Sequence, residues 1–76
     1  MIKVLFFASL REQIGQNHLS VAWQEGLTPE RLWQKITKNS TLPDHILVAC
    51  NQTYCDRDTP LSEGDEVAFF PPVTGG

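Results

Sequence analysis

The sequence has 76 residues, of which 41% are hydrophobic and 20% are charged, and its formal net charge is −3. This length leaves room for one small core and excludes a second, and the composition excludes an intrinsically disordered chain. The acidic balance argues against a nucleic-acid backbone as partner and favours a basic protein surface.

The first 23 residues predict two strands separated by a short helical turn. Residues 2–8 alternate between two largely apolar faces, which is typical of a strand with neighbours on both sides. Residues 9–17 are polar and predict a helical turn that closes at Gly15. Residues 18–23 alternate again and predict a second strand. Its inward residues are expected to be Leu19, Val21 and Trp23.

The middle of the chain predicts one helix. Thr28 is a capping residue, Pro29 suits the first helical position, and Glu30 complements the positive end of the helix dipole. The helix is expected to run to about Lys38 before Asn39-Ser40 ends it. Its apolar face is expected to contain Leu32, Trp33 and Ile36.

The remainder of the chain predicts three further strands. Residues 46–50 form the first, and a tight turn at Asn51-Gln52 leads into a short strand around Tyr54. Residues 62–65 form another turn before the last strand at 66–70. The expected fold class is therefore α+β, with a mixed sheet of four to five strands and one main helix packed on one face.

One helix cannot cover both faces of such a sheet. We expect it to pack on the face made by Val4, Phe6, Val67 and Phe69. The opposite face would then expose a contiguous apolar patch made by Leu5, Phe7, Ala68 and Phe70. A patch of this kind usually marks an interaction site, although small domains also carry scattered surface aromatics that have no such role.

Residues 1–70 are expected to form the domain and residues 71–76 (PPVTGG) an extended tail. Pro71 and Pro72 fix φ and favour an extended path, and glycines without side chains would let the tail enter a narrow channel. The carboxylate of Gly76 would then reach a partner's active site. The alternative is a frayed end that does no chemistry.

No residue pattern indicates that the chain catalyses a reaction or binds a metal by itself. Cys50 follows an apolar run and is expected to be buried and inert, whereas Cys55 is expected to be more exposed. His18 and His45 lack the spacing of a metal site. The acidic turn is expected to be solvated or to dock a basic partner, and its residues are Glu63, Asp65 and Glu66.

The sequence also predicts a cytoplasmic protein with no membrane partner. No apolar run approaches the roughly 20 residues that span a bilayer. The apolar stretch at residues 1–8 is too short for a signal peptide.

Three blocks of the sequence carry a specific resemblance to a known family. The closing block is PLSEGDEVAFFPPVTGG at residues 60–76. The opening block is VLFFA at residues 4–8, followed by Arg11-Glu12 and Gly15, and the middle block is ACNQT at residues 49–53. In this order they resemble the small subunits of molybdopterin synthase, a family of sulfur carriers with the ubiquitin-like β-grasp fold.

The resemblance implies covalent sulfur transfer through the last residue. An adenylyltransferase of the ubiquitin-activating type would use ATP to adenylate the Gly76 carboxylate, and a persulfide sulfur would displace AMP to leave a thiocarboxylate. The tail would then enter the large subunit of the synthase and donate sulfur to a cyclic pyranopterin precursor. This step forms the dithiolene of molybdopterin in molybdenum cofactor biosynthesis. The chain itself would bind no cofactor, and the acid–base residues would belong to the large subunit.

The resemblance also assigns residues to these steps. Gly76 would carry the sulfur, Gly75 and Thr74 would thread the channel, and residues 71–73 would hold the tail straight. An apolar dock for both partners would be made by Phe7, Tyr54 and Phe70. Sharing one dock would make the two complexes mutually exclusive, and the working synthase would be a heterotetramer with two copies of each subunit.

Two positions depart from the family, and three other functions remain open. Cys50 stands where valine is usual, and Tyr54 where an aliphatic contact residue is common. The chain would otherwise be a sulfur carrier for thiazole or thio-tRNA synthesis, or a ubiquitin-like modifier joined through Gly76 to lysines. A third alternative is an interaction domain whose tail (Pro71, Pro72, Val73 and the residues beyond) does no chemistry.

Overall fold

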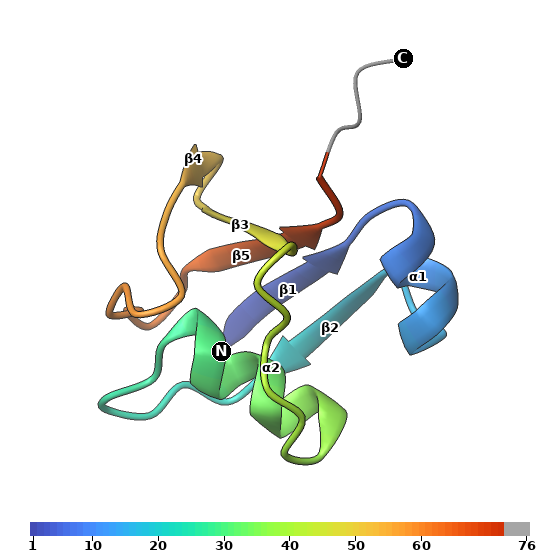
Figure 1. Cartoon of the computed structure of the whole chain (residues 1–76). Helices are drawn as coiled ribbons and strands as arrows, with labels where there is room; N and C mark the ends of the chain where they lie inside the picture. Colours follow the sequence, from blue (N-terminus) through green and yellow to red (C-terminus); the bar gives the residue numbers. More distant parts are fainter. Residues whose placement is uncertain (73–76) are drawn as a thin grey trace.

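The computed structural model describes residues 1–72 and confirms the predicted order of elements (Figure 1). The strands are β1 (Ile2–Phe6), β2 (His18–Val21), β3 (Leu47–Cys50), β4 (Thr53–Tyr54) and β5 (Glu66–Phe70). The helices are α1 (Ser9–Ile14) and α2 (Pro29–Thr37). The division of the chain into a domain and a tail at residue 70 stays a prediction.

The strands form one mixed sheet in the order β2-β1-β5-β3-β4. The β1 and β5 strands are parallel, and the other neighbours are antiparallel. As predicted, β1 has a neighbour on each side. In the parallel pair Val4 lies opposite Val67 and Phe6 lies opposite Phe69, so their side chains share one face.

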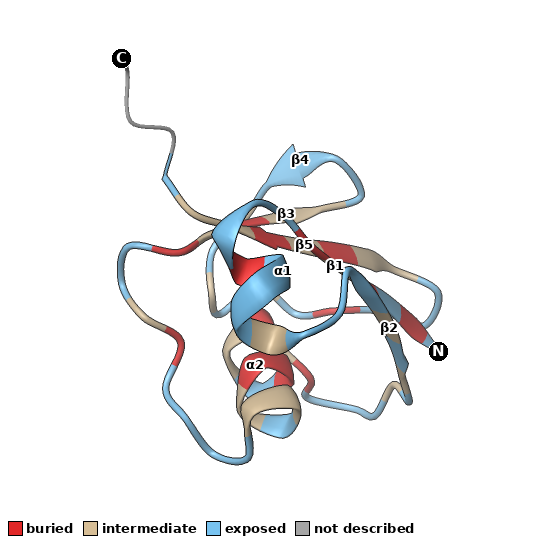
Figure 2. Cartoon of the chain, turned by 90° about the vertical axis from the view of Figure 1, so that its right-hand side faces the viewer, coloured by how far each residue is buried: buried red, intermediate tan, exposed pale blue. Residues whose placement is uncertain are grey.

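The helix α2 covers this inner face, and the core lies between them (Figure 2). The Trp33 ring of α2 meets the Phe69 ring edge-on with centroids 5.0 Å apart, and Phe69 stacks on Phe6 at 6.1 Å. The residues predicted for the inner face are all buried, as are Leu32 and Trp33 of the helix. The α+β class and the choice of face are therefore confirmed.

Local signals set the helix ends as expected. Thr28 Oγ1 accepts a hydrogen bond from the Arg31 backbone N–H at 3.2 Å, which caps α2, and Pro29 begins the helix. The helix ends at Thr37, and Lys38 is a left-handed cap instead of a helical residue. Gly15 closes α1 in the left-handed region with φ 86°.

Three strand boundaries differ from the prediction. The β1 strand ends at Phe6 because Ala8 turns the backbone to φ 53° and ψ −131°. The β2 strand ends at Val21, and Trp23 lies beyond it with its indole N–H donating to the Leu61 carbonyl at 2.7 Å. The β3 strand begins at residue 47, because the Ile46 backbone N–H turns back to the Pro43 carbonyl.

The helices within residues 1–72 can be tested for the ability to cross a membrane. Neither α1 nor α2 has the length and apolar character of a membrane-crossing helix.

Candidate functional site

The outer face of the sheet, opposite α2, carries a row of apolar side chains that crosses four strands. Leu5 pairs with Ala68, Ala68 pairs with Ala49, and Ala49 pairs with Tyr54. Paired residues of adjacent strands point to the same side of a sheet, so these four share the outer face. A second pair, Leu47 with Phe70, extends it toward the end of β5. We call these residues together with Phe7 the outer patch.

The structure brings the three predicted dock residues together on this patch. Tyr54 and Phe70 have ring centroids 5.7 Å apart. Phe7 and Phe70 line one shallow hollow of about 290 Å³. Phe7 is 46% exposed and Tyr54 is 71% exposed. Large exposed apolar groups on either side of a third aromatic ring are typical of a protein-binding surface.

The sequence prediction missed part of this surface. The hollow is also lined by Ala49, Gln52 and Glu66, and Leu47 belongs to the patch by its pairing with Phe70. The available signal was the alternation in residues 46–50. Because Val48 is buried, its neighbours Leu47 and Ala49 must point outward.

The chain leaves the sheet at the edge of the outer patch. The Phe7 backbone N–H donates to the Phe69 carbonyl at 3.2 Å, which continues the β1–β5 pairing to the end of β5. Phe70 ends that strand, Pro71 is half-buried and Pro72 is exposed. The predictions for Val73, Thr74, Gly75 and Gly76 lie outside the described residues.

The acidic turn is more structured than expected. Asp65 is half-buried, and hydrogen bonds from the Ser62 backbone N–H and the Asn51 side chain hold the pKa of its carboxyl below the usual value. The prediction of a solvated turn is therefore wrong for Asp65, and also for Glu66, which is half-buried at the start of β5. Glu63 pairs with the amino group of Met1, which lowers the pKa of Glu63. The acidic dock stays a prediction.

The two cysteines are both half-buried, so the expected contrast between them is wrong. Burial raises the pKa of the Cys50 thiol to about 11, and the nearby Asp65 carboxylate adds to this effect. Burial also raises the pKa of Cys55. Both thiols are therefore protonated near neutral pH. The prediction that Cys50 is buried is wrong, and its inertness stays a prediction. Within residues 1–72 no group of three His, Cys, Asp or Glu side chains is placed to hold a metal ion.

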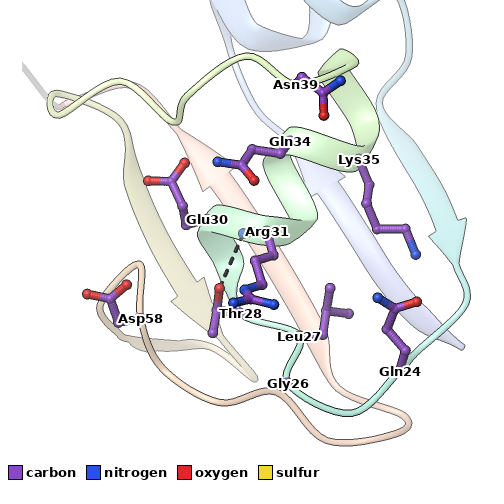
Figure 3. A pocket seen from close by; sticks show the side chains of 10 residues that line it. All are labelled: Gln24, Gly26, Leu27, Thr28, Glu30, Arg31, Gln34, Lys35, Asn39 and Asp58. Carbon is purple, nitrogen blue, oxygen red and sulfur yellow. Dashed lines mark hydrogen bonds between the residues drawn. The ribbon is translucent and has the colours of Figure 1, made fainter.

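A larger hollow of about 600 Å³ lies beside α2 (Figure 3). Its lining is polar and mixed in charge, with Arg31 and Lys35 from the helix and Asp58 from a neighbouring loop. The Thr28 hydroxyl there already caps the helix, as the dashed line shows. Because this hollow lacks the aromatic surface of the outer patch, the outer patch is the candidate site.

Comparison with known proteins gives the family. The model of the ThiS family matches residues 4–76. The chain belongs to the ThiS family. The molybdopterin synthase sulfur carrier subunit of Escherichia coli is 50% identical to it over the whole length of both chains. This identity confirms the resemblance that the three sequence blocks predicted.

Solved structures confirm the β-grasp architecture of ubiquitin-like proteins. SAMP1 from Haloferax volcanii superposes with a TM-score of 0.80 at 25% identity, over 99% of this chain and 98% of that one. The putative molybdopterin converting factor subunit 1 from Pyrococcus furiosus gives 0.78 at 26% identity, over 95% and 97%. Both have the sheet and the single main helix in common with this chain.

Proposed function

We propose that this chain is the sulfur carrier subunit of a molybdopterin synthase and that it delivers sulfur as a thiocarboxylate on Gly76. The observation that carries the proposal is the position of the outer patch at the end of β5, where Phe70 leads directly into Pro71. A partner bound to this patch lies where the tail begins. The full-length similarity to a sulfur carrier subunit supports the same function.

The chemistry begins with activation of the terminal carboxylate. A carboxylate is a poor electrophile, so an adenylyltransferase joins it to AMP from ATP and releases pyrophosphate. A persulfide sulfur then displaces AMP, and cleavage of the resulting sulfur–sulfur bond by a thiol leaves the thiocarboxylate. Splitting the transfer into an activation and a displacement lowers each barrier.

The second stage takes place on the large subunit of the synthase. The tail brings the thiocarboxylate sulfur to a cyclic pyranopterin precursor, and two deliveries build the dithiolene. This chain contributes the sulfur and a docking surface, while the large subunit supplies the acid–base residues. The chain holds no cofactor of its own, and ATP is bound by the activating enzyme.

The outer patch serves both partners in this proposal. Phe7, Tyr54 and Phe70 are its aromatic residues, and aromatic side chains dominate the energetics of protein interfaces. Because both partners need the same patch, only one binds at a time. The carrier therefore has to leave the activating enzyme before it binds the synthase, and the working synthase holds two copies of each subunit.

The other functions are less well supported. The chain is 50% identical to a molybdopterin synthase sulfur carrier subunit. It is only 25% identical to SAMP1, whose full name is small archaeal modifier protein 1. A sulfur carrier and a lysine-linked modifier share the acyl adenylate and differ in whether sulfur or an amine attacks it. Adducts on lysines that survive denaturation would therefore support the modifier.

Intact-mass spectrometry tests the proposal directly. The purified chain is incubated with the activating enzyme, ATP and a persulfide donor, and its mass is expected to rise by the difference between one sulfur and one oxygen. The same chain without Gly76 is the control and should keep its mass. An unchanged mass for the full chain, with an enzyme that adenylates a known carrier, would refute the proposal.

A matched pair of variants tests the outer patch. Phe70→Asp places a charge in the patch and should weaken binding to the large subunit, since a charge buried against an apolar partner is costly. Gln24→Asp adds the same charge on the exposed hollow beside α2 and should leave binding unchanged. Equal affinities for the two variants would remove the patch from the interface.

A further inference from the structure

Two turns at one end of the sheet are joined by a single asparagine. The side-chain Nδ2 of Asn51, in the β3–β4 turn, donates to Asp65 Oδ1 at 3.0 Å. Its Oδ1 accepts from the Glu66 backbone N–H at 3.0 Å, and its own backbone N–H donates to the Glu66 carbonyl at 2.7 Å. Asn51 has φ 51°, a left-handed conformation that asparagine tolerates better than most residues. The β3–β4 turn is thereby bound to the start of β5.

The other oxygen of Asp65 holds the second turn. Asp65 Oδ2 accepts from the Ser62 backbone N–H at 2.7 Å, and the Cys50 thiol donates to the same oxygen at 3.7 Å. One carboxylate therefore joins the turn at residues 62–65 to the turn at 51–52. Hydrogen bonds to an ionised group are stronger than those between neutral groups.

The β4 arm of the hairpin that these bonds hold has few other contacts among the described residues. The β4 strand consists of Thr53 and Tyr54 and lies at the edge of the sheet, and within residues 1–72 its one pairing partner is β3. The β3 strand is paired with β5 along its whole length, so the weakly held part of the hairpin is β4 with its turn. Tyr54 is also 71% exposed, so little packing holds its ring beside Phe70.

We propose that Asn51 and Asp65 are positioning residues that hold the β3–β4 hairpin, and through it set Tyr54 against Phe70 in the outer patch for partner binding. The part that concerns binding rests on the proposed function. Neither residue lines the hollow of the patch, so their effect on binding is indirect. Their loss loosens the hairpin and leaves the buried core in place.

A reciprocal exchange of the two side chains tests the pair. Asn51→Asp sets two carboxylates against each other, whereas Asp65→Asn turns an NH₂ group toward either the Ser62 N–H or the Asn51 Nδ2. The double exchange, N51D with D65N, restores a donor opposite every acceptor and keeps the net charge. Each single variant is expected to bind the large subunit roughly tenfold more weakly. The double exchange is expected to bind within about threefold of the unchanged chain.

Matched controls are available beside α2. Asn39 is an exposed asparagine that, like Asn51, has a positive φ, here 78°. Asp58 is an exposed aspartate, and both residues line the larger hollow beside α2. Asn39→Asp and Asp58→Asn make the same chemical changes at the hollow beside α2 (Figure 3). Both controls are expected to bind like the unchanged chain.

A Tyr54→Ala background separates positioning from a general loss of stability. If Asn51 acts through Tyr54, Asn51→Asp should cause no further loss of affinity once the ring is gone. The same tenfold loss in both backgrounds, or a double exchange that fails to recover, would overturn the proposal.

Amide hydrogen exchange measures the local stability of the hairpin in the absence of any partner. The Cys55 N–H, which donates to the Val48 carbonyl at 3.1 Å, should exchange faster in each single variant and recover in the double exchange. Unchanged exchange in the single variants would refute the role in holding the hairpin. If the chain without substitutions does not bind the large subunit, the proposed function is refuted. The hydrogen-exchange experiment would still decide whether Asn51 and Asp65 hold the hairpin.

Discussion

Phe69 and Phe70 are adjacent in the sequence, yet truncating them should impair different properties. Phe69 is fully buried and contacts the rings of Phe6 and Trp33, whereas Phe70 is half-buried on the outer patch beside Tyr54. The contrast arises because consecutive residues of a strand point to opposite faces. Phe69→Ala and Phe70→Ala are therefore a matched pair with the same chemical change.

The expected magnitudes follow from the burial. Removing a fully buried phenylalanine costs about 3–5 kcal/mol, and this cost includes the lost ring contacts. A domain of this length has only about 4–11 kcal/mol of folding free energy, so Phe69→Ala should leave a large unfolded fraction. Phe70→Ala loses roughly half the burial of such a ring, which costs about 1 kcal/mol. It should instead weaken binding to the large subunit about 10- to 100-fold.

Two measurements check this pair. Urea unfolding followed by the fluorescence of Trp33 and Trp23 gives the free energy of unfolding. Calorimetric titration with the large subunit gives the affinity of the folded protein. Equal destabilisation of the domain by Phe70→Ala and Phe69→Ala would refute the assignment of the two faces, and so would an unchanged affinity of the Phe70→Ala variant for the large subunit.

Three further substitutions test single features of the fold. Ala8→Gly should raise the free energy of unfolding by about 1 kcal/mol, because φ 53° with ψ −131° strains any side chain, and a lower urea midpoint would contradict this. Thr28→Ala should lower the stability by about 1 kcal/mol through loss of the cap on α2, with Gln24→Ala as the control that should not. The pKa of the Cys50 thiol is about 11 in the folded chain, against a usual value of 9.0. As the pH rises, this thiol therefore loses its proton in the unfolded chain before it does so in the folded chain. Stability should fall as the pH rises from about 9 to 11, and Cys50→Ala should lessen this fall, which pH-dependent urea midpoints would show.

The sequence determined most of the fold because its signals are local. Thr28-Pro29 begins a helix through a side-chain cap and a fixed φ, and Gly15 and Gly64 supply the left-handed turns. Alternation in residues 2–6 and 66–70 placed Val4 and Val67 in the core. Boundaries were less accurate where a backbone conformation departs from what its residue usually adopts, as at Ala8.

The candidate site could be predicted in part for the same reason. Phe7 and Phe70 were placed on the exposed face by alternation alone, and Tyr54 came from the family resemblance. Their grouping on one part of the sheet depends on which strands are neighbours, and alternation carries no information about strand order. Alternation in residues 46–50 turns Leu47 and Ala49 outward, but it does not show that β3 lies beside β5, so these two residues were missed.

By itself, the sequence determined the class of fold, the covered and uncovered faces of the sheet, and the family, because all three depend on residue order and spacing. Only the tertiary structure decided that Leu5, Ala68, Ala49 and Tyr54 form one row and that Asn51 reaches Asp65. The physical reason is that these contacts join residues far apart in the chain. Pairing of β1 with β5 and of β5 with β3 brings them together, and the free energy that selects this pairing comes from the shared core beneath α2.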